Sequence, residues 1–427
     1  MSKAAALSMA SLEHPLPAGM RDLLPEEAAA RRAVARAFLG HAELFGYEQV
    51  IPPVFEYAHT IERGLGTLDP REIVRFVEPE TGEVVALRPD VTPQIARLVA
   101  TRLPHMTPPY RLAYDASVLR RRVGSRARTH RQIAQLGVEL LGVRFLEGDT
   151  ELLVLAARAL SAMGLPSFQI DLGHADVFKS LVAGLEPARA EALAVALGHK
   201  DRAEVARLAG ELPIAAALAA LCDLHGAPAL LESLPAALLS SPAAPAIAEL
   251  RQLVSQLGKE LEGVPGVTLT VDLGEVRGLA YYTGPFYQVL AEGPGVPVGA
   301  GGRYDQLLER FDCPLPASGL ALDVDALLWA LRAAKSPLLV RPRRVVVHGV
   351  GAASLARALR SAHVPVAVLG GDAADAARYA ADWSYALVVD ARVHEVSFED
   401  RAGSRTSVPT AGACAAIVSR LGSEERS

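Results

Sequence analysis

Three stretches of the chain differ in their pattern of strand and helix signals, and this difference constrains the fold more than any other feature. Before residue 175, and again over Thr268–Ala334, strand-like runs alternate with turns and helices. The stretch between them, residues 175–265, is rich in alanine and leucine and poor in strand formers. Prolines divide it into short pieces: Pro213, Pro228, Pro235 and Pro242. Because proline ends helices, this spacing predicts an α+β core that is interrupted by a helical insert.

The last part of the chain has a different pattern of strand and helix signals. Val345–Val347, Val364–Leu369 and Ala386–Val389 have strand character, and helical segments separate them. This alternation predicts a small α/β domain with a mainly parallel sheet. The expected organisation is a flexible tail over 1–18, a core over 19–334 with the insert at about 175–265, a linker over 335–343, and a C-terminal α/β domain over 344–427.

Composition excludes several classes of protein. Hydrophobic residues make up 51% of the 427 residues and charged residues 21%, a balance typical of globular rather than disordered chains. The net charge of −5 gives no global basic field for nucleic-acid phosphates. The cysteines Cys222, Cys313 and Cys414 show no metal or disulfide spacing, so we expect no metal and a cytoplasmic location. The longest apolar run, Ile214–Cys222, is too short for a membrane span, and residues 1–14 lack the apolar segment of a signal peptide, so we expect neither a membrane nor a secreted protein.

The first group of candidate site residues lies where a strand over Val84–Leu87 meets a helix over Pro93–Leu103. The Asp90 carboxylate and the Thr92 hydroxyl would project from this junction, where they could hold an ammonium group. The alternative is that one of them caps the helix. The residues alone favour neither reading.

The second group begins with six arginines, Arg120, Arg121, Arg122, Arg126, Arg128 and Arg131. They could clamp phosphate or carboxylate groups, or they could form a solvated hairpin tip. Gln135 and Glu139 follow in a strand-like run and would share one face of that strand. Polar groups on an inward apolar face need hydrogen-bond partners, and a bound polar ligand would supply them.

The third group is Arg277 with the adjacent Tyr281 and Tyr282. An arginine is a natural partner for a carboxylate. On a strand the two tyrosines would point to opposite faces, so that only one would line a given pocket wall. The alternative is a core tyrosine and a surface arginine.

Several segments, in this order along the chain, resemble the catalytic core of class II histidyl-tRNA synthetases: Ala18–Pro25, Gly46–Val50, Leu87–Pro89, Gln135–Glu139, Val276–Leu279, Tyr281–Tyr282 and Gly301–Asp305. The resemblance covers about three quarters of the chain and implies an antiparallel sheet core of the class II type. Residues 344–409 resemble a shortened anticodon-binding domain. The resemblance also implies a histidine site made of Asp90, Thr92, Arg120, Gln135, Glu139, Arg277, Tyr281 and Tyr282.

The sequence departs from that family where the family binds ATP. Arg122 stands where the resemblance implies a glutamate that contacts adenine, and Ala326 where it implies an arginine that holds phosphates. Asp323 and Asp325 would repel phosphates there. In the histidine pocket the shorter Asp90 replaces a glutamate. The resemblance therefore implies that histidine recognition is retained and that ATP activation is lost.

This combination resembles the synthetase paralogues that serve as regulatory subunits of short-form ATP phosphoribosyltransferase, and Arg88–Arg97 and Asp171–His174 are close to their versions. The resemblance implies a non-catalytic subunit without a cofactor. It would bind L-histidine and mediate feedback control of histidine biosynthesis together with the short catalytic subunit, and tRNA is not an expected partner. The alternatives are an active histidyl-tRNA synthetase, which the retained C-terminal domain keeps open, and an enzyme that activates histidine for another acceptor.

The resemblance also implies a homodimer within a larger hetero-oligomer. Gly46–Tyr57 is similar to the first class II motif, which forms a two-fold interface in the family. We expect the apolar stripe of the preceding helix, with Val34, Phe38 and Phe45, to contribute together with Val50–Phe55. The alternative is that these residues face the core of their own chain.

Overall fold

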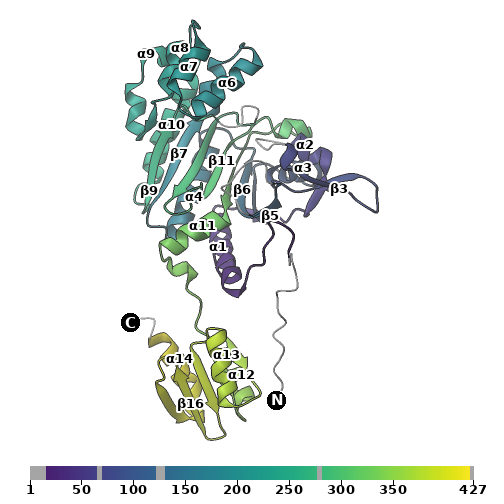
Figure 1. The fold of residues 1–427 in the computed structure, drawn as a ribbon, viewed down its shortest axis with the longest axis vertical. Helices are drawn as coiled ribbons and strands as arrows, with labels where there is room; N and C mark the ends of the chain where they lie inside the picture. The colour runs from purple at the N-terminus through teal and green to yellow at the C-terminus, as the bar shows by residue number, and fades with distance from the viewer. Residues whose placement is uncertain (1–15, 65–69, 122–129, 277–280, 424–427) are drawn as a thin grey trace. The chain divides into compact units, whose positions relative to one another are not determined.

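The computed structural model describes residues 16–64, 70–121, 130–276 and 281–423, and Figure 1 shows their fold. The chain divides into two compact units, Met1–Leu339 and Val340–Ser427. Most of the expected tail over 1–18 lies outside the described residues. No described helix is long and apolar enough to cross a membrane.

The larger unit is built on a nine-stranded sheet with the order β1-β5-β6-β12-β11-β10-β7-β9-β8. Its strands are β1 (Glu48–Gln49), β5 (Tyr110–Leu119), β6 (Gln132–Leu141), β7 (Phe168–His174), β8 (His225–Gly226), β9 (Val267–Asp272), β10 (Pro285–Ala291), β11 (Gly299–Arg303) and β12 (Ala317–Asp323). Only β1 with β5 and β7 with β9 pair in parallel. The largely antiparallel sheet confirms the predicted α+β core.

Helices that pack into one hydrophobic core cover one face of this sheet: α1 (Pro25–Leu44), α4 (Glu147–Ala162), α10 (Ala244–Glu260) and α11 (Val324–Ala333). Proline at its first position and Glu26 and Glu27 in its first turn favour the start of α1. Val34 and Phe38 are fully buried in the core of their own chain. The expectation that the stripe of α1 contributes to an intersubunit surface is therefore wrong for Val34 and Phe38, because these side chains are already used for folding, whereas Phe45 is only partly buried.

The opposite face carries a second apolar cluster, formed by strands of the sheet with α3 (Thr92–Arg102) and η4 (Leu308–Phe311). Beside it lie η2 (Pro70–Glu72), α2 (Ala58–Arg63) and a small sheet of β2 (Phe55–Tyr57), β4 (Val84–Leu87) and β3 (Val74–Val77). Buried Arg88 joins the small sheet to β5, because its guanidinium donates to the carbonyls of Ser117 at 2.8 Å and Pro52 at 2.8 Å.

The helical insert lies between β7 and β9, as the sequence predicted. It contains α5 (Ala175–Leu181), α6 (Pro187–Gly198), α7 (Arg202–Ala209), α8 (Ala215–Leu221), the short strand β8, η3 (Pro228–Ser233), α9 (Ala236–Leu239) and α10. Pro228 opens η3 and Pro235 directly precedes α9, so these prolines divide the insert as expected.

The short helix η5 (Pro337–Leu339) ends the larger unit. The smaller unit contains β13 (Val345–His348), α12 (Ala352–Ser361), β14 (Val366–Val368), α13 (Ala373–Asp382), β15 (Leu387–Ala391), β16 (Glu395–Asp400), β17 (Arg405–Pro409), η6 (Thr410–Gly412) and α14 (Ala413–Ser423). Its five-stranded sheet has the order β14-β13-β15-β16-β17. Strand β13 pairs in parallel with β14 and β15, whereas β15 with β16 and β16 with β17 pair antiparallel. The prediction of a mainly parallel sheet is thus wrong for two of the four pairings, because short connections without a helix join β15 to β16 and β16 to β17, the second through a turn at Gly403 (φ +81°).

Candidate functional site

The centre of the candidate site is Glu139, on the face of β6 that packs toward α3. Its side chain is only 2% exposed. The Thr92 hydroxyl donates to one carboxylate oxygen at 2.6 Å, and the Tyr304 hydroxyl donates to the other. Burial raises the pKa of Glu139 well above its ordinary value; the hydrogen bond from Thr92 opposes this effect and the charge of Asp90 adds to it.

Gln135 lies four residues before Glu139 on the same strand, so both side chains lie on one face, as predicted. Gln135 is 9% exposed, and its Oε1 atom has no hydrogen-bond partner among the described residues. A buried carbonyl oxygen without a partner is costly. A donor from a bound ligand would satisfy it.

A glycine on β12 makes room for the buried carboxylate. Gly319 pairs with Glu139 across the sheet. A Cβ atom at this position would lie 2.1 Å from Glu139 Oε2 and 2.3 Å from the Tyr304 hydroxyl oxygen. Only glycine therefore permits this hydrogen-bonded arrangement.

The polar residues between β4 and α3 do not cap the helix. Residue Val91 occupies the N-cap position of α3, and no side chain caps this helix. The Asp90 carboxylate accepts from the Val91 backbone N–H at 2.7 Å, while Thr92 turns to Glu139. Arg120 lies next to this junction, because its Nε atom donates to the Pro89 carbonyl at 2.8 Å. The capping alternative is therefore wrong.

Tyr281 and Tyr282 lie in the loop before β10, not on a strand as predicted. Their rings contact each other edge to face at 5.1 Å, and Tyr281 also stacks on Tyr304 at 5.1 Å. Burial raises the pKa of Tyr281 well above its ordinary value, and the charges of Asp90 and Glu139 reinforce the effect. Both rings thus lie on the side of the pocket near Tyr304. Arg277 lies outside the described residues.

The sequence did not single out two tyrosines that belong to this site, Tyr304 and Tyr114. Tyr114 on β5 is fully buried opposite Gly137, and its hydroxyl has no partner among the described residues. A Cβ atom at Gly137 would lie 2.3 Å from that hydroxyl oxygen. The glycine between Gln135 and Glu139 was the available signal, since a glycine inside a strand often marks a close approach.

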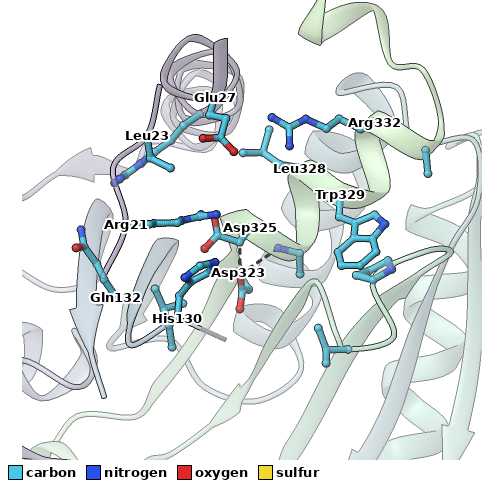
Figure 2. A pocket seen from close by; sticks show the side chains of 16 residues that line it. Arg21, Leu23, Glu27, His130, Gln132, Asp323, Asp325, Leu328, Trp329 and Arg332 are labelled. Atoms are coloured by element: carbon cyan, nitrogen blue, oxygen red, sulfur yellow. Dashed lines mark hydrogen bonds and ion pairs between the residues drawn. The ribbon is translucent and has the colours of Figure 1, made fainter. Parts of the chain in front are cut away.

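Ala326, at the position of the family's phosphate-binding arginine, lies in the first turn of α11. It lines a cavity of about 640 Å³, where Asp323 and Asp325 lie beside Arg21 (Figure 2). Asp323 Oδ1 accepts from the backbone N–H groups of Asp325 at 3.1 Å and Ala326 at 3.2 Å, and Asp325 forms an ion pair with Arg21. Both carboxylates are therefore used within the fold, and the start of α11 already has an anionic cap. Arg122 lies outside the described residues.

Comparison with known proteins places this fold in a class. Residues 19–327 match the profile of the histidyl-tRNA synthetase family. The fold is also similar to histidyl-tRNA synthetase from Nostoc sp. PCC 7120, with a TM-score of 0.78 over 96% of this chain and 100% of that one, at 19% identity. The class is thus that of proteins built on the histidyl-tRNA synthetase fold, as predicted.

Two further comparisons narrow the assignment. The chain is 41% identical over 343 residues to the ATP phosphoribosyltransferase regulatory subunit of Anaeromyxobacter sp. (strain Fw109-5), covering 78% of this chain and 98% of the relative. A solved structure from Bacillus halodurans, described as an ATP phosphoribosyltransferase regulatory subunit/histidyl-tRNA synthetase, has a TM-score of 0.77 at 27% identity and covers 89% of this chain and 98% of that one. This chain belongs to the family of ATP phosphoribosyltransferase regulatory subunits.

Proposed function

We propose that the chain is a non-catalytic regulatory subunit of ATP phosphoribosyltransferase that binds histidine and mediates feedback control of the first step of histidine biosynthesis. Its relatives' names support the regulatory role. The observation that carries the histidine assignment is the buried polar pocket, in which Gln135 Oε1 lacks a partner and Glu139 holds two hydroxyl groups.

The chemistry of the pocket fits an amino acid with a polar ring. Asp90 supplies a carboxylate for the ammonium group, and Arg120 supplies a cation for the carboxylate, a role that Arg277 would share. Glu139 and Gln135 offer acceptors to an imidazole N–H, and Tyr281 supplies an aromatic wall. A buried acceptor that is left unpaired costs about 1–3 kcal/mol, so a ligand that pairs it is favoured.

The start of α11 supports the absence of ATP activation. Catalysis of adenylate formation needs preorganised cations around the phosphates. Here Ala326 offers no charge, and Asp323 occupies the backbone N–H groups that could otherwise bind an anion. Histidine-dependent pyrophosphate exchange above background would favour the synthetase alternative instead.

The direct test combines the purified chain with the short catalytic subunit and measures phosphoribosyl transfer with and without histidine. We expect the chain to be required for inhibition by histidine. Gln135→Leu should weaken histidine binding in calorimetry by about 1–3 kcal/mol, the cost of a lost buried hydrogen bond. Gln252→Leu, on the exposed side of α10, is the matched control. Failure of the parent chain to bind histidine would refute the proposal.

The proposed homodimer would use the segment after α1 and the small three-stranded sheet. Ile51 is 82% exposed and Phe55 44%, and the Phe55 ring packs edge to face on Phe76 at 5.6 Å. Further exposed apolar residues lie in the same region: Val54, Tyr57, Val77 and Val84. Phe55, Tyr57 and Phe76 share one face of the small sheet, whereas Val77 and Val84 pair on its other face. Exposed apolar residues gathered in one region are typical of an interaction surface. The catalytic subunit would then add to this dimer in a larger hetero-oligomer.

Light scattering tests the dimer. The parent should have about twice the chain mass of 45.1 kDa. The double variant Ile51→Glu/Phe55→Glu should be monomeric, because two charges cannot be buried in an apolar interface. Val195→Glu, an exposed position on α6, should remain dimeric. A parent chain that stays monomeric at micromolar concentration and with the catalytic subunit present would contradict both the dimer and the partner.

A further inference from the structure

The helical insert holds the loop of Tyr281 and Tyr282 through its first helix, α5. The Lys179 ammonium group donates to the Tyr282 carbonyl. At the start of the same helix, the Ala175 backbone N–H donates to the Gly284 carbonyl at 3.0 Å. The loop therefore has two backbone attachments to the insert.

The other side of the loop is attached to the large sheet. The Thr283 backbone N–H donates to the Arg303 carbonyl at 2.8 Å, and the Thr283 hydroxyl accepts from the Asp305 backbone N–H at 2.8 Å. The loop is thus clamped between α5 and the end of β11. A movement of α5 relative to the sheet would act on the loop through Lys179 and Ala175.

Helix α5 is joined in turn to α10, a helix of 17 residues in the insert. His174 Nδ1 accepts from the Asp176 backbone N–H at 3.2 Å, so its Nε2 atom carries the proton that it donates to Glu249 at 3.1 Å. A cavity of about 380 Å³, lined by Lys179, His174 and Glu249 among others, opens between α5 and the beginning of α10. Buried apolar residues of both helices, among them Phe178 and Ile247, belong to one core, and the polar contacts of His174 lie beside this cavity.

The loop leads directly to the centre of the pocket. Tyr282 contacts Tyr281, Tyr281 stacks on Tyr304, and the Tyr304 hydroxyl bonds to Glu139. A displaced Tyr282 backbone would shift the Tyr281 ring against Tyr304. The position of this loop thus sets the pocket wall.

We propose that Lys179 is a positioning residue that ties the helical insert to the histidine pocket by holding the Tyr282 carbonyl. The identity of the ligand in this inference rests on the proposed function. Burial lowers the pKa of Lys179, an effect that Asp176 beside it opposes. The Lys179 ammonium group and the Ala175 N–H are the donors by which α5 holds this loop. Removing the donor should therefore release the loop.

The test uses the full chain and three variants. Lys179→Met removes the donor and keeps the side-chain length, Lys179→Arg keeps a cationic donor, and Lys259→Met makes the same charge change on the exposed surface of α10. Calorimetry should show histidine binding at least tenfold weaker in Lys179→Met and within threefold of the parent in the other two. Without histidine, hydrogen exchange at the amides of residues 281–286 should be faster in Lys179→Met alone.

These measurements distinguish a failure of the proposed histidine binding from a failure of the proposed role of Lys179. If the parent does not bind histidine, the proposed function fails, and loop exchange alone then decides the role of Lys179. Parent-like exchange in Lys179→Met would overturn the inference, as would parent-like affinity where the parent binds histidine. An equal loss in Lys179→Arg would also overturn it, because side-chain shape rather than hydrogen bonding would then hold the loop.

Discussion

Two places on the same sheet differ in how the fold uses their polar groups. Around Glu139, a buried carboxyl group is bonded to two hydroxyl groups while the Gln135 oxygen next to it has no partner. At the start of α11, Asp323 caps the helix and Asp325 pairs with Arg21. The first place keeps polar capacity for a ligand, and the second uses its carboxylates for the fold. The difference supports the proposal that the chain binds an amino acid at the first place and does not activate it with ATP at the second.

The largest effect should follow from closing the space beside Glu139. Gly319→Ala places a Cβ atom within 2.1 Å of the Glu139 carboxylate and forces it away from Tyr304. Overpacking of this kind costs about 3 kcal/mol, which corresponds to ~100-fold weaker histidine binding. Calorimetry measures this loss of histidine affinity. Gly258→Ala in α10, where a Cβ would meet nothing within 4 Å, is the control, and equal affinities in both variants would contradict the proposed pocket.

The pH dependence of the free energy of unfolding should show whether the buried Glu139 carboxyl group is protonated in the folded chain. Burial raises the pKa of Glu139, so the folded chain keeps this proton at pH values where the unfolded chain has lost it. Stability from this group is complete below the unfolded pKa of about 4.3 and falls as pH rises toward the folded pKa, by at most about 1.4 kcal/mol per pH unit. Glu139→Gln should lose this slope in denaturant unfolding without histidine. A parallel pH profile in parent and variant would argue against a protonated Glu139.

A smaller effect is expected at the start of α11. Asp323→Ala removes the cap of this helix and should lower the free energy of unfolding by about 1 kcal/mol. Asp323→Asn keeps a capping oxygen and should lose much less. Asp323 pairs with Gln135 across the sheet, but its carboxylate bonds to backbone N–H groups at the start of α11. Histidine affinity should therefore stay close to the parent value in both variants. A change in affinity would show that the two places are coupled.

The smallest effect is expected from restoring the family's arginine. Ala326→Arg should leave histidine-dependent pyrophosphate exchange at background, because one cation among carboxylates that are already used does not create a preorganised phosphate site. Asp323→Ala/Ala326→Arg tests whether the cap is the remaining obstacle. Pyrophosphate exchange clearly above background in Ala326→Arg would contradict the view that the carboxylates at the start of α11 prevent phosphate binding.

Local patterns in the sequence predicted much of the architecture. Alternation along Gln132–Leu141 predicted a strand with Gln135 and Glu139 on one face, since side chains on a strand repeat every two residues. Spaced prolines predicted the divided insert, because proline ends helices. The loop of Tyr281 and Tyr282 was missed, because contacts with α5 and β11 rather than local pattern hold it out of the sheet.

By itself, the sequence determined which polar groups exist and which local elements carry them, because helix and strand periods and caps depend on neighbouring residues. Only the tertiary structure decided which of those groups have hydrogen-bond partners. Tyr304 reaches Glu139 from 165 residues away, and Thr92 reaches it from 47 residues away, through the space that Gly319 leaves. A buried hydrogen bond needs its partner within about 3 Å, and chain folding, not spacing along the sequence, brings such partners together.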